Sequence, residues 1–160
     1  MGDTRPGASV WIATAGGVGY FPVAPGTAGS LVGVGIVLAL GLLPVTFRWR
    51  SAAVAVVAVI LMILGAAAAS KAETFFGRVD PSQVVIDEVV GQMIALVAWP
   101  VAGWKTYVAG FILFRFFDIV KPFPAGRCER IAGGWGIMLD DVVAGAYSLL
   151  LLWVGGVVGI

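Results

Sequence analysis

Hydrophobic residues fill most of the chain in long runs, which short polar or Gly/Pro-rich segments separate. A membrane-spanning helix needs about 20 mostly apolar residues, and the runs are close to that length. The pattern therefore predicts an all-α protein, a polytopic membrane bundle of about five helices. The predicted helices cover Gly29 to Phe47, Ser51 to Ser70, Val84 to Trp99, Trp104 to Val120 and Ile137 to Ile160.

Two features complicate this pattern. The runs between Val84 and Val120 contain charged residues, so a bundle of four spanning helices, in which this region crosses only in part, is the main alternative. The segment from Ala15 to Gly29 is rich in glycine and proline. Because proline lacks a backbone donor and glycine lowers helix stability, this segment is predicted to be a re-entrant or interfacial loop.

The composition is that of a membrane protein, and the length suits one domain over residues 1 to 160. Hydrophobic residues make up 60% of the chain and charged residues 12%, against about 25% charged in ordinary soluble domains. The net charge of +1 offers no basic surface for nucleic acid, and no protein partner is predictable. The chain has no histidine, which excludes Ser-His-Asp triads, phosphohistidine intermediates and His-ligated zinc sites.

Basic residues predict the orientation of the bundle. With five helices and the N-terminus inside, six basic residues lie inside and three outside, which agrees with the positive-inside rule. This orientation also places the Gly/Pro-rich loop and the acidic pairs described below at the cytoplasmic ends of their helices. The inside set is Arg5, Lys71, Arg78, Lys121, Arg127 and Arg130, and the outside set is Arg48, Arg50 and Lys105.

Adjacent acidic residues occur twice in this apolar chain, as Asp87-Glu88 and as Asp140-Asp141. Carboxylates near a helix N-terminus interact favourably with the helix dipole, so a structural role is one interpretation. An unpaired charge within a membrane is costly, however, and neighbouring carboxylates repel each other. The two pairs therefore favour a cation between them.

Small residues predict that the two acidic helices meet. Gly91 and Gly145 lie one turn beyond the acidic pairs, where small residues let helices approach closely. The resulting donors are all oxygens, and hard oxygen donors without His or Cys favour Mg²⁺, or else Mn²⁺ or Ca²⁺. The candidate metal ligands are Asp87, Glu88, Asp118, Asp140 and Asp141.

The segment APGTAGS, which runs into the first predicted helix, has groups that suit a phosphate. Free N–H groups at a helix N-terminus after glycine bind anions, and hydroxyls add donors. Gly26, Thr27 and Ser30 are therefore candidate phosphate-binding residues. Helix packing explains the glycines equally well.

Arg115 and Lys121 flank Asp118 in the segment FRFFDIVKP, and Pro122 is predicted to end the helix just after Lys121. The two cations could hold a phosphate while Asp118 binds the metal. Alternatively, they extend toward the membrane surface around an ion-paired Asp118.

Three segments resemble the phosphatidylglycerophosphatase A family. They are GYFPVAPGTAGSLVG (Gly19 to Gly33), VVIDEVVGQMIAL (Val84 to Leu96) and FRFFDIVKPFPAGRCERIAGGWGIMLDDVVAGAYS (Phe114 to Ser148). Their order and spacing fit that family over nearly the whole chain, and the third segment is the most specific. Between the segments, the match is one of hydrophobicity.

The resemblance implies a Mg²⁺-dependent lipid phosphatase of the bacterial cytoplasmic membrane, with its active site facing the cytoplasm. The expected reaction is hydrolysis of the terminal phosphomonoester of phosphatidylglycerophosphate to phosphatidylglycerol and phosphate, in phospholipid biosynthesis. Attack by water and attack by a carboxylate both remain open. The expected catalytic residues are Asp87, Glu88, Asp118 and Asp141, and the phosphate-binding residues are Arg115, Lys121, Thr27, Ser30 and Gly26.

The main alternative is a small transport protein in which the acidic residues line an ion path. Such a protein would spread its acidic residues across the depth of the membrane, whereas they are predicted here to cluster at one end. The sequence leaves open the number of metal ions, the acyl-chain preference and the oligomeric state.

Overall fold

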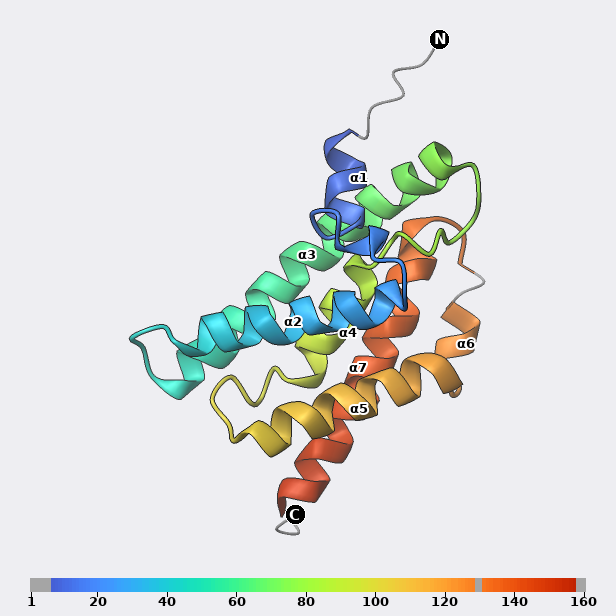
Figure 1. Ribbon diagram of the computed structural model, residues 1–160. Helices are drawn as coiled ribbons and strands as arrows, with labels where there is room; N and C mark the ends of the chain where they lie inside the picture. Colours follow the sequence, from blue (N-terminus) through green and yellow to red (C-terminus); the bar gives the residue numbers. More distant parts are fainter. Residues whose placement is uncertain (1–6, 129–130, 158–160) are drawn as a thin grey trace.

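Helices and their connections make up residues 7–128 and 131–157, which are the residues that this computed structural model describes, and no strand occurs among them. The predicted all-α class is confirmed. Arg5 and Arg130, which belong to the predicted inside set, lie outside the described residues. The elements in Figure 1 are α1 (Ala8–Ala13), η1 (Val18–Tyr20), α2 (Pro25–Gly41), α3 (Phe47–Phe76), α4 (Ile86–Ala95), α5 (Trp104–Val120), α6 (Ala125–Cys128) and α7 (Gly134–Val157).

The N-terminal loop is shorter than the sequence predicts. The chain turns through Gly16 and Gly17, which both have positive φ, but α2 begins at Pro25 rather than at Gly29. Proline is favoured in the first turn of a helix, because its φ is already helical and its missing N–H would have no partner there. Gly26 therefore lies within the first turn of α2 and not in a loop.

Two other helix ends follow from local sequence. α5 has the predicted bounds, and Lys121 directly after it takes a left-handed φ of 46° before Pro122. α3 has 30 residues, more than predicted, and ends at Gly77 with a φ of 66°. Glycine adopts this conformation without a Cβ clash, which makes it a common residue after a helix.

The short helix α4 occupies the centre of the bundle and contacts α2, α3, α5 and α7 (Figure 1). It has 10 residues and is therefore about 15 Å long, which is shorter than the bilayer core. The helix predicted from Val84 to Trp99 is therefore shorter in the structure and cannot span the bilayer by itself. This agrees with the alternative of four spanning helices, in which this region crosses only in part. Pro100 disfavours helical backbone at Trp99.

Two helices, α3 and α7, are long and apolar enough to cross a membrane by length and composition. Exposed tryptophans lie near both ends of these helices, with Trp49 and Trp153 toward one end and Trp135 toward the other. Tryptophan is enriched at both membrane–water interfaces. The distribution of these side chains is typical of helices that cross a bilayer.

The helix ends gather in two groups. The starts of α2, α4 and α7 meet the ends of α3 and α5, and we call this the acidic end; the Gly134 amide, for instance, donates to Ser70 Oγ of α3 at 2.7 Å. At the opposite or far end, Gly41 lies against Pro100, and Gly156 lies against Trp99. All acidic residues that the structure describes lie at the acidic end.

Candidate active site

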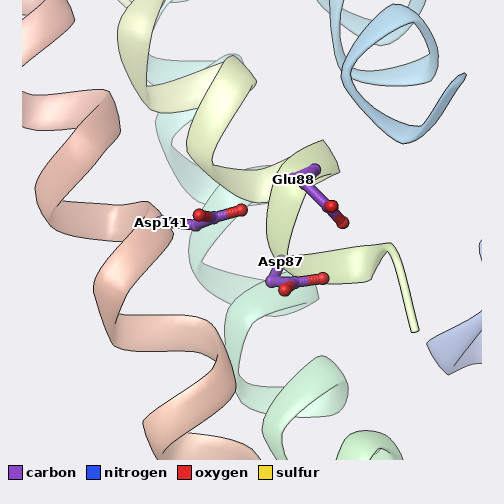
Figure 2. A group of neighbouring side chains, drawn as sticks. All are labelled: Asp87, Glu88 and Asp141. Carbon is purple, nitrogen blue, oxygen red and sulfur yellow. The ribbon is translucent and has the colours of Figure 1, made fainter. Parts of the chain in front are cut away.

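Three carboxylates from two helices meet at the acidic end. Asp87 and Glu88 lie in the first turn of α4, and Asp141 projects from α7 toward α4 (Figure 2). One oxygen from each side chain lies within 4.8 Å of the other two. The predicted meeting of the two acidic pairs is therefore confirmed for these three residues.

The site combines the buried Asp141 with the half-buried Asp87 and Glu88, and some of their oxygens lack hydrogen-bond donors. Asp141 is only 2% exposed. Three oxygens have no hydrogen-bond partner within the described part of the chain: Asp87 Oδ1, Glu88 Oε2 and Asp141 Oδ2. Buried carboxylates without partners are costly, and adjacent negative charges add repulsion. The three oxygens form a set of hard donors that could hold a divalent cation.

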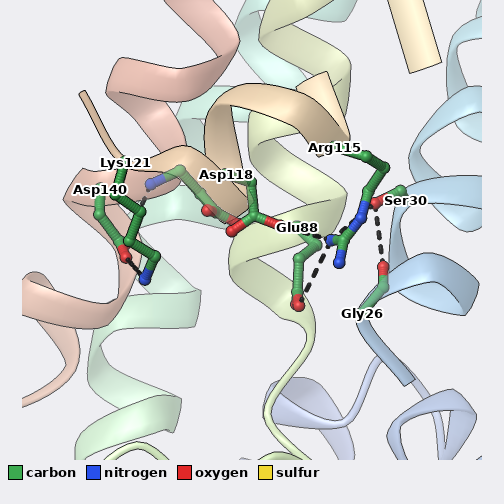
Figure 3. Close-up of polar contacts among 8 residues, drawn as sticks. Gly26, Ser30, Glu88, Arg115, Asp118, Lys121 and Asp140 are labelled. Atoms are coloured by element: carbon green, nitrogen blue, oxygen red, sulfur yellow. Dashed lines mark hydrogen bonds and ion pairs between the residues drawn. The ribbon is translucent and has the colours of Figure 1, made fainter. Parts of the chain in front are cut away.

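Arg115 of α5 links acidic groups of two helices and a hydroxyl group of a third helix (Figure 3). Its Nη1 lies 2.6 Å from Asp118 Oδ2 and 3.8 Å from Glu88 Oε1. The same nitrogen donates to Ser30 Oγ of α2 at 3.5 Å. Arg115 therefore holds Glu88 beside Asp118, and its side chain remains 20% exposed.

Lys121 and Asp140 form a second ion pair at the site, with 2.7 Å between Nζ and Oδ2 (Figure 3). Asp140 Oδ1 also accepts a hydrogen bond from the Asp141 amide at 3.0 Å. Asp140 thus connects the cation to the turn of α7 that carries Asp141. Lys121 follows α5 directly and has a left-handed backbone conformation.

The start of α2 lies directly against the acidic residues. A Cβ at Gly26 would collide with the Glu88 carboxylate and would lie 3.1 Å from Arg115 Nη1. Ser30 Oγ donates to the Gly26 carbonyl oxygen at 2.9 Å. Thr27 lies in the same first turn of α2, and its side chain forms no hydrogen bond with the described residues of the cluster. A side chain in place of Gly26 would therefore displace the Glu88 carboxylate.

Gly91 and Gly145 bring α4 and α7 together, as predicted. A Cβ at Gly145 would overlap the carbonyl oxygen of Gly91, and a Cβ at Gly91 would lie 2.7 Å from the carbonyl oxygen of Asp141. The two helices therefore meet through their backbones one turn from the carboxylates.

The structure divides the predicted metal ligands into two kinds. Asp87, Glu88 and Asp141 form the three-carboxylate group. Asp118 and Asp140 pair instead with Arg115 and Lys121, although the electrostatic interaction of Asp118 with Asp141 shows that it lies nearby. The role of these two residues as metal ligands stays a prediction.

Gln92 is a polar residue of this region that the sequence analysis does not single out. It is fully buried, and neither its amide nitrogen nor its amide oxygen has a partner among the described residues. It lies one turn after Glu88 on α4 and packs against Gly33 of α2. The spacing of four residues from Glu88 is the signal that could have identified it.

Comparison with known proteins identifies similar chains. A model of the family described as phosphatidylglycerophosphatase A matches residues 11–155. A protein of Bacteroides thetaiotaomicron, provisionally named phosphatidylinositol-3-phosphatase, is 47% identical over 92% of this chain and 95% of its own length. Proteins named phosphatidylglycerophosphatase A from Haemophilus influenzae and Escherichia coli are 39% and 34% identical over 86% of this chain. These matches cover 82% and 77% of the respective relatives. No solved structure matches the chain.

Proposed function

The chain belongs to the phosphatidylglycerophosphatase A family, whose members are phosphoric monoester hydrolases, and we propose that it removes the terminal phosphate of phosphatidylglycerophosphate. The products would be phosphatidylglycerol and inorganic phosphate. The observation that carries the proposal is the cluster of Asp87, Glu88 and Asp141, which lies beside the Arg115 guanidinium. The two long apolar helices support a membrane location, where a lipid substrate is available.

We assign Asp87, Glu88 and Asp141 as ligands of a Mg²⁺ ion, with Asp118 and Asp140 as further candidates. A Mg²⁺ ion fits this site because three carboxylate oxygens have no hydrogen-bond partner among the described residues. The donor set also contains no nitrogen or sulfur. When bound, Mg²⁺ supplies charge neutralisation for the phosphoryl group and lowers the pKa of a bound water.

Arg115 and Lys121 are positioned to bind the phosphate that is removed. The contacts of Arg115 in the described residues all use Nη1, so its Nη2 and Nε remain available to two phosphate oxygens. Paired N–H groups of a guanidinium match the geometry of a phosphate. Lys121 is 28% exposed beside Asp140 and adds a second positive charge. Both cations would stabilise the charge on the phosphoryl oxygens during the reaction.

Hydrolysis forms one bond to phosphorus and breaks another. The oxygen of the attacking group bonds to phosphorus as the bond from phosphorus to the glycerol oxygen breaks, and the glycerol oxygen takes up a proton. The attacking oxygen comes from water, or from a carboxylate whose phosphoryl ester water then hydrolyses. Asp118, which lies outside the three-carboxylate group, is a candidate for moving the proton.

The deciding experiment measures phosphate release by the detergent-purified protein from phosphatidylglycerophosphate, phosphatidylinositol 3-phosphate and phosphatidic acid, each with Mg²⁺ and with EDTA. We expect release from phosphatidylglycerophosphate that EDTA abolishes. The second lipid is included because one relative is named for it. Faster release from that lipid would make it the substrate, and no release from any lipid by folded protein in Mg²⁺ would contradict a lipid phosphatase.

We further propose that the protein lies in the bacterial cytoplasmic membrane with its acidic end facing the cytoplasm. Lys71, Arg78 and Arg127 lie toward this end together with Lys121, which agrees with the positive-inside rule. Cys128, the single cysteine, is partly exposed in α6 at the same end. A membrane-impermeant maleimide should therefore label it in inside-out vesicles but not in intact spheroplasts. Labelling of the spheroplasts would reverse the orientation.

A further inference from the structure

The far end of the bundle carries only positive charge among the described residues. Arg48 and Arg50 lie in the first turn of α3, and Lys105 lies in the first turn of α5. None of the three forms an ion pair within the part of the chain that the structure describes. The described acidic residues all lie at the other end, so this surface is complementary to an anion.

A cavity of about 650 Å³ lies at the far end between α5 and α7. Its walls along the helices are apolar and include Leu113 and Leu151. Lys105, in the first turn of α5, and Trp99 also line the cavity, and we call this part its rim. The cavity therefore combines an apolar interior with a cation at one side.

The rim lies where a membrane interface is expected. Trp104, beside Lys105, is 72% exposed, and Trp153 of α7 is 59% exposed. Exposed tryptophans of membrane helices lie at the level of the lipid headgroups. The apolar walls extend from this level toward the middle of the helices, since Leu113 lies two turns after Lys105 along α5.

We propose that this cavity binds one anionic phospholipid from the membrane. Its phosphate lies at Lys105, and one acyl chain extends along Leu113 and Leu151. A zwitterionic lipid would bring an ammonium group to a surface that already carries three uncompensated cations, so an anionic headgroup is preferred. The site lies at the opposite end of α5 from Lys121 and does not depend on the proposed reaction.

Native mass spectrometry of the full-length protein tests the preference. The protein is released from detergent in the presence of equal amounts of phosphatidylglycerol and phosphatidylcholine. We expect the native chain to retain phosphatidylglycerol preferentially, and Lys105→Gln to lower that preference about two- to fivefold, as for one partly exposed ion pair. Arg48→Gln removes the same charge from the same end outside the cavity and should lower it less.

A second pair of variants tests the cavity itself. A Cβ at Gly155, which lines the cavity, meets no atom within 4 Å, so Gly155→Leu can occupy the space without a backbone clash. Gly35 of α2 also has no atom within 4 Å of a Cβ and lines none of the described cavities, so Gly35→Leu is the matched control. We expect Gly155→Leu to lose one bound phosphatidylglycerol and Gly35→Leu to retain it.

Three results would overturn the proposal. They are equal retention of the two lipids by the native chain, an equal effect of Lys105→Gln and Arg48→Gln, and unchanged lipid binding in Gly155→Leu. Phosphatidylglycerol bound at the acidic end would be common to all variants, so the differences between matched variants report the far-end cavity alone. Each of these results leaves the phosphatase assay unaffected, and the two proposals therefore fail separately.

Discussion

Gly145 of α7 lies against the carbonyl oxygen of Gly91 in α4, so closely that no side chain fits between the two helices. The contact is made by backbone atoms, and backbone atoms cannot rotate away as a side chain can. It therefore sets the distance between the helix that carries Asp141 and the helix that carries Asp87. The geometry of the carboxylates depends on two residues that have no functional group of their own.

We expect Gly145→Ala to destabilise the protein and to lower its activity. The added methyl group overlaps the Gly91 carbonyl oxygen, and overpacking of this kind costs about 1–3 kcal/mol. Thermal unfolding in detergent and phosphate release measure the two effects. Gly35→Ala is the control, because its methyl group meets no atom within 4 Å and alanine is favoured in a helix by about 0.5–1 kcal/mol. Equal unfolding temperatures for the two variants would contradict the backbone contact.

Gly26→Ala should lower activity much more than stability. Its methyl group collides with the Glu88 carboxylate and approaches Arg115, and both side chains can move aside. Small stability losses are then expected, but a displacement of about 1 Å in a catalytic site can lower the rate about 100-fold. Turnover and unfolding temperature are compared with those of Gly35→Ala. Normal turnover in Gly26→Ala would show that the position of Glu88 is not critical.

The long helices could be predicted from sequence because hydrophobic runs of membrane length have few alternatives to a helix. α5 has the predicted bounds, since Gly103 precedes it and Pro122 follows Lys121. The length of α4 could not be predicted, because the apolar run continues beyond Ala95 to Trp99 and hydrophobicity does not distinguish a helix from a buried turn. The start of α2 at Pro25 could have been predicted, because proline is favoured in the first turn of a helix.

The residues of the candidate site and the ion pair of Asp118 could be predicted from sequence, but the contacts between distant segments could not. Asp87, Glu88 and Asp141 are recognisable because adjacent acids are rare in an apolar chain, and the glycines nearby indicate the close approach of their helices. That Arg115 also contacts Glu88 of α4, besides Asp118 of its own helix, depends on side-chain directions in the folded bundle. Sequence spacing contains no information on such contacts between distant segments.

Arg115→Lys should impair catalysis although it keeps the positive charge. One nitrogen of the guanidinium contacts Glu88, Asp118 and Ser30, and its other nitrogens remain for the phosphate. The ammonium group of a lysine has a single nitrogen and cannot contact both these residues and the phosphate. Loss of a donor to a transition state costs about 100- to 1000-fold in turnover. Steady-state kinetics should show a fall in kcat. A change in KM alone would indicate that Arg115 contributes only to substrate binding.

Asp141→Asn should remove the response of the protein to Mg²⁺. In the native chain, ligand binding to the folded state adds about 2.7 kcal/mol of stability at 100 times the dissociation constant, so Mg²⁺ should raise the unfolding temperature and EDTA should lower it. Asparagine keeps the shape of the side chain but removes one of the three clustered carboxylates. Repulsion falls, so the variant in EDTA should be at least as stable as the native chain in EDTA.

Asp141→Asn should gain little stability from Mg²⁺. Its rate of phosphate release should fall at least about 100-fold, since mutation of residues that only support metal ligands already lowers activity about 10- to 100-fold. Ser148→Ala is the control on the same face of α7, because its buried hydroxyl donates to the Ala144 carbonyl oxygen and not to the carboxylates. It should keep the Mg²⁺-dependent rise. If Asp141→Asn shows the same rise as the native chain, Asp141 is not a ligand. If neither protein responds to Mg²⁺ or EDTA, the three carboxylates do not hold a divalent cation, and their repulsion must be relieved by protons instead.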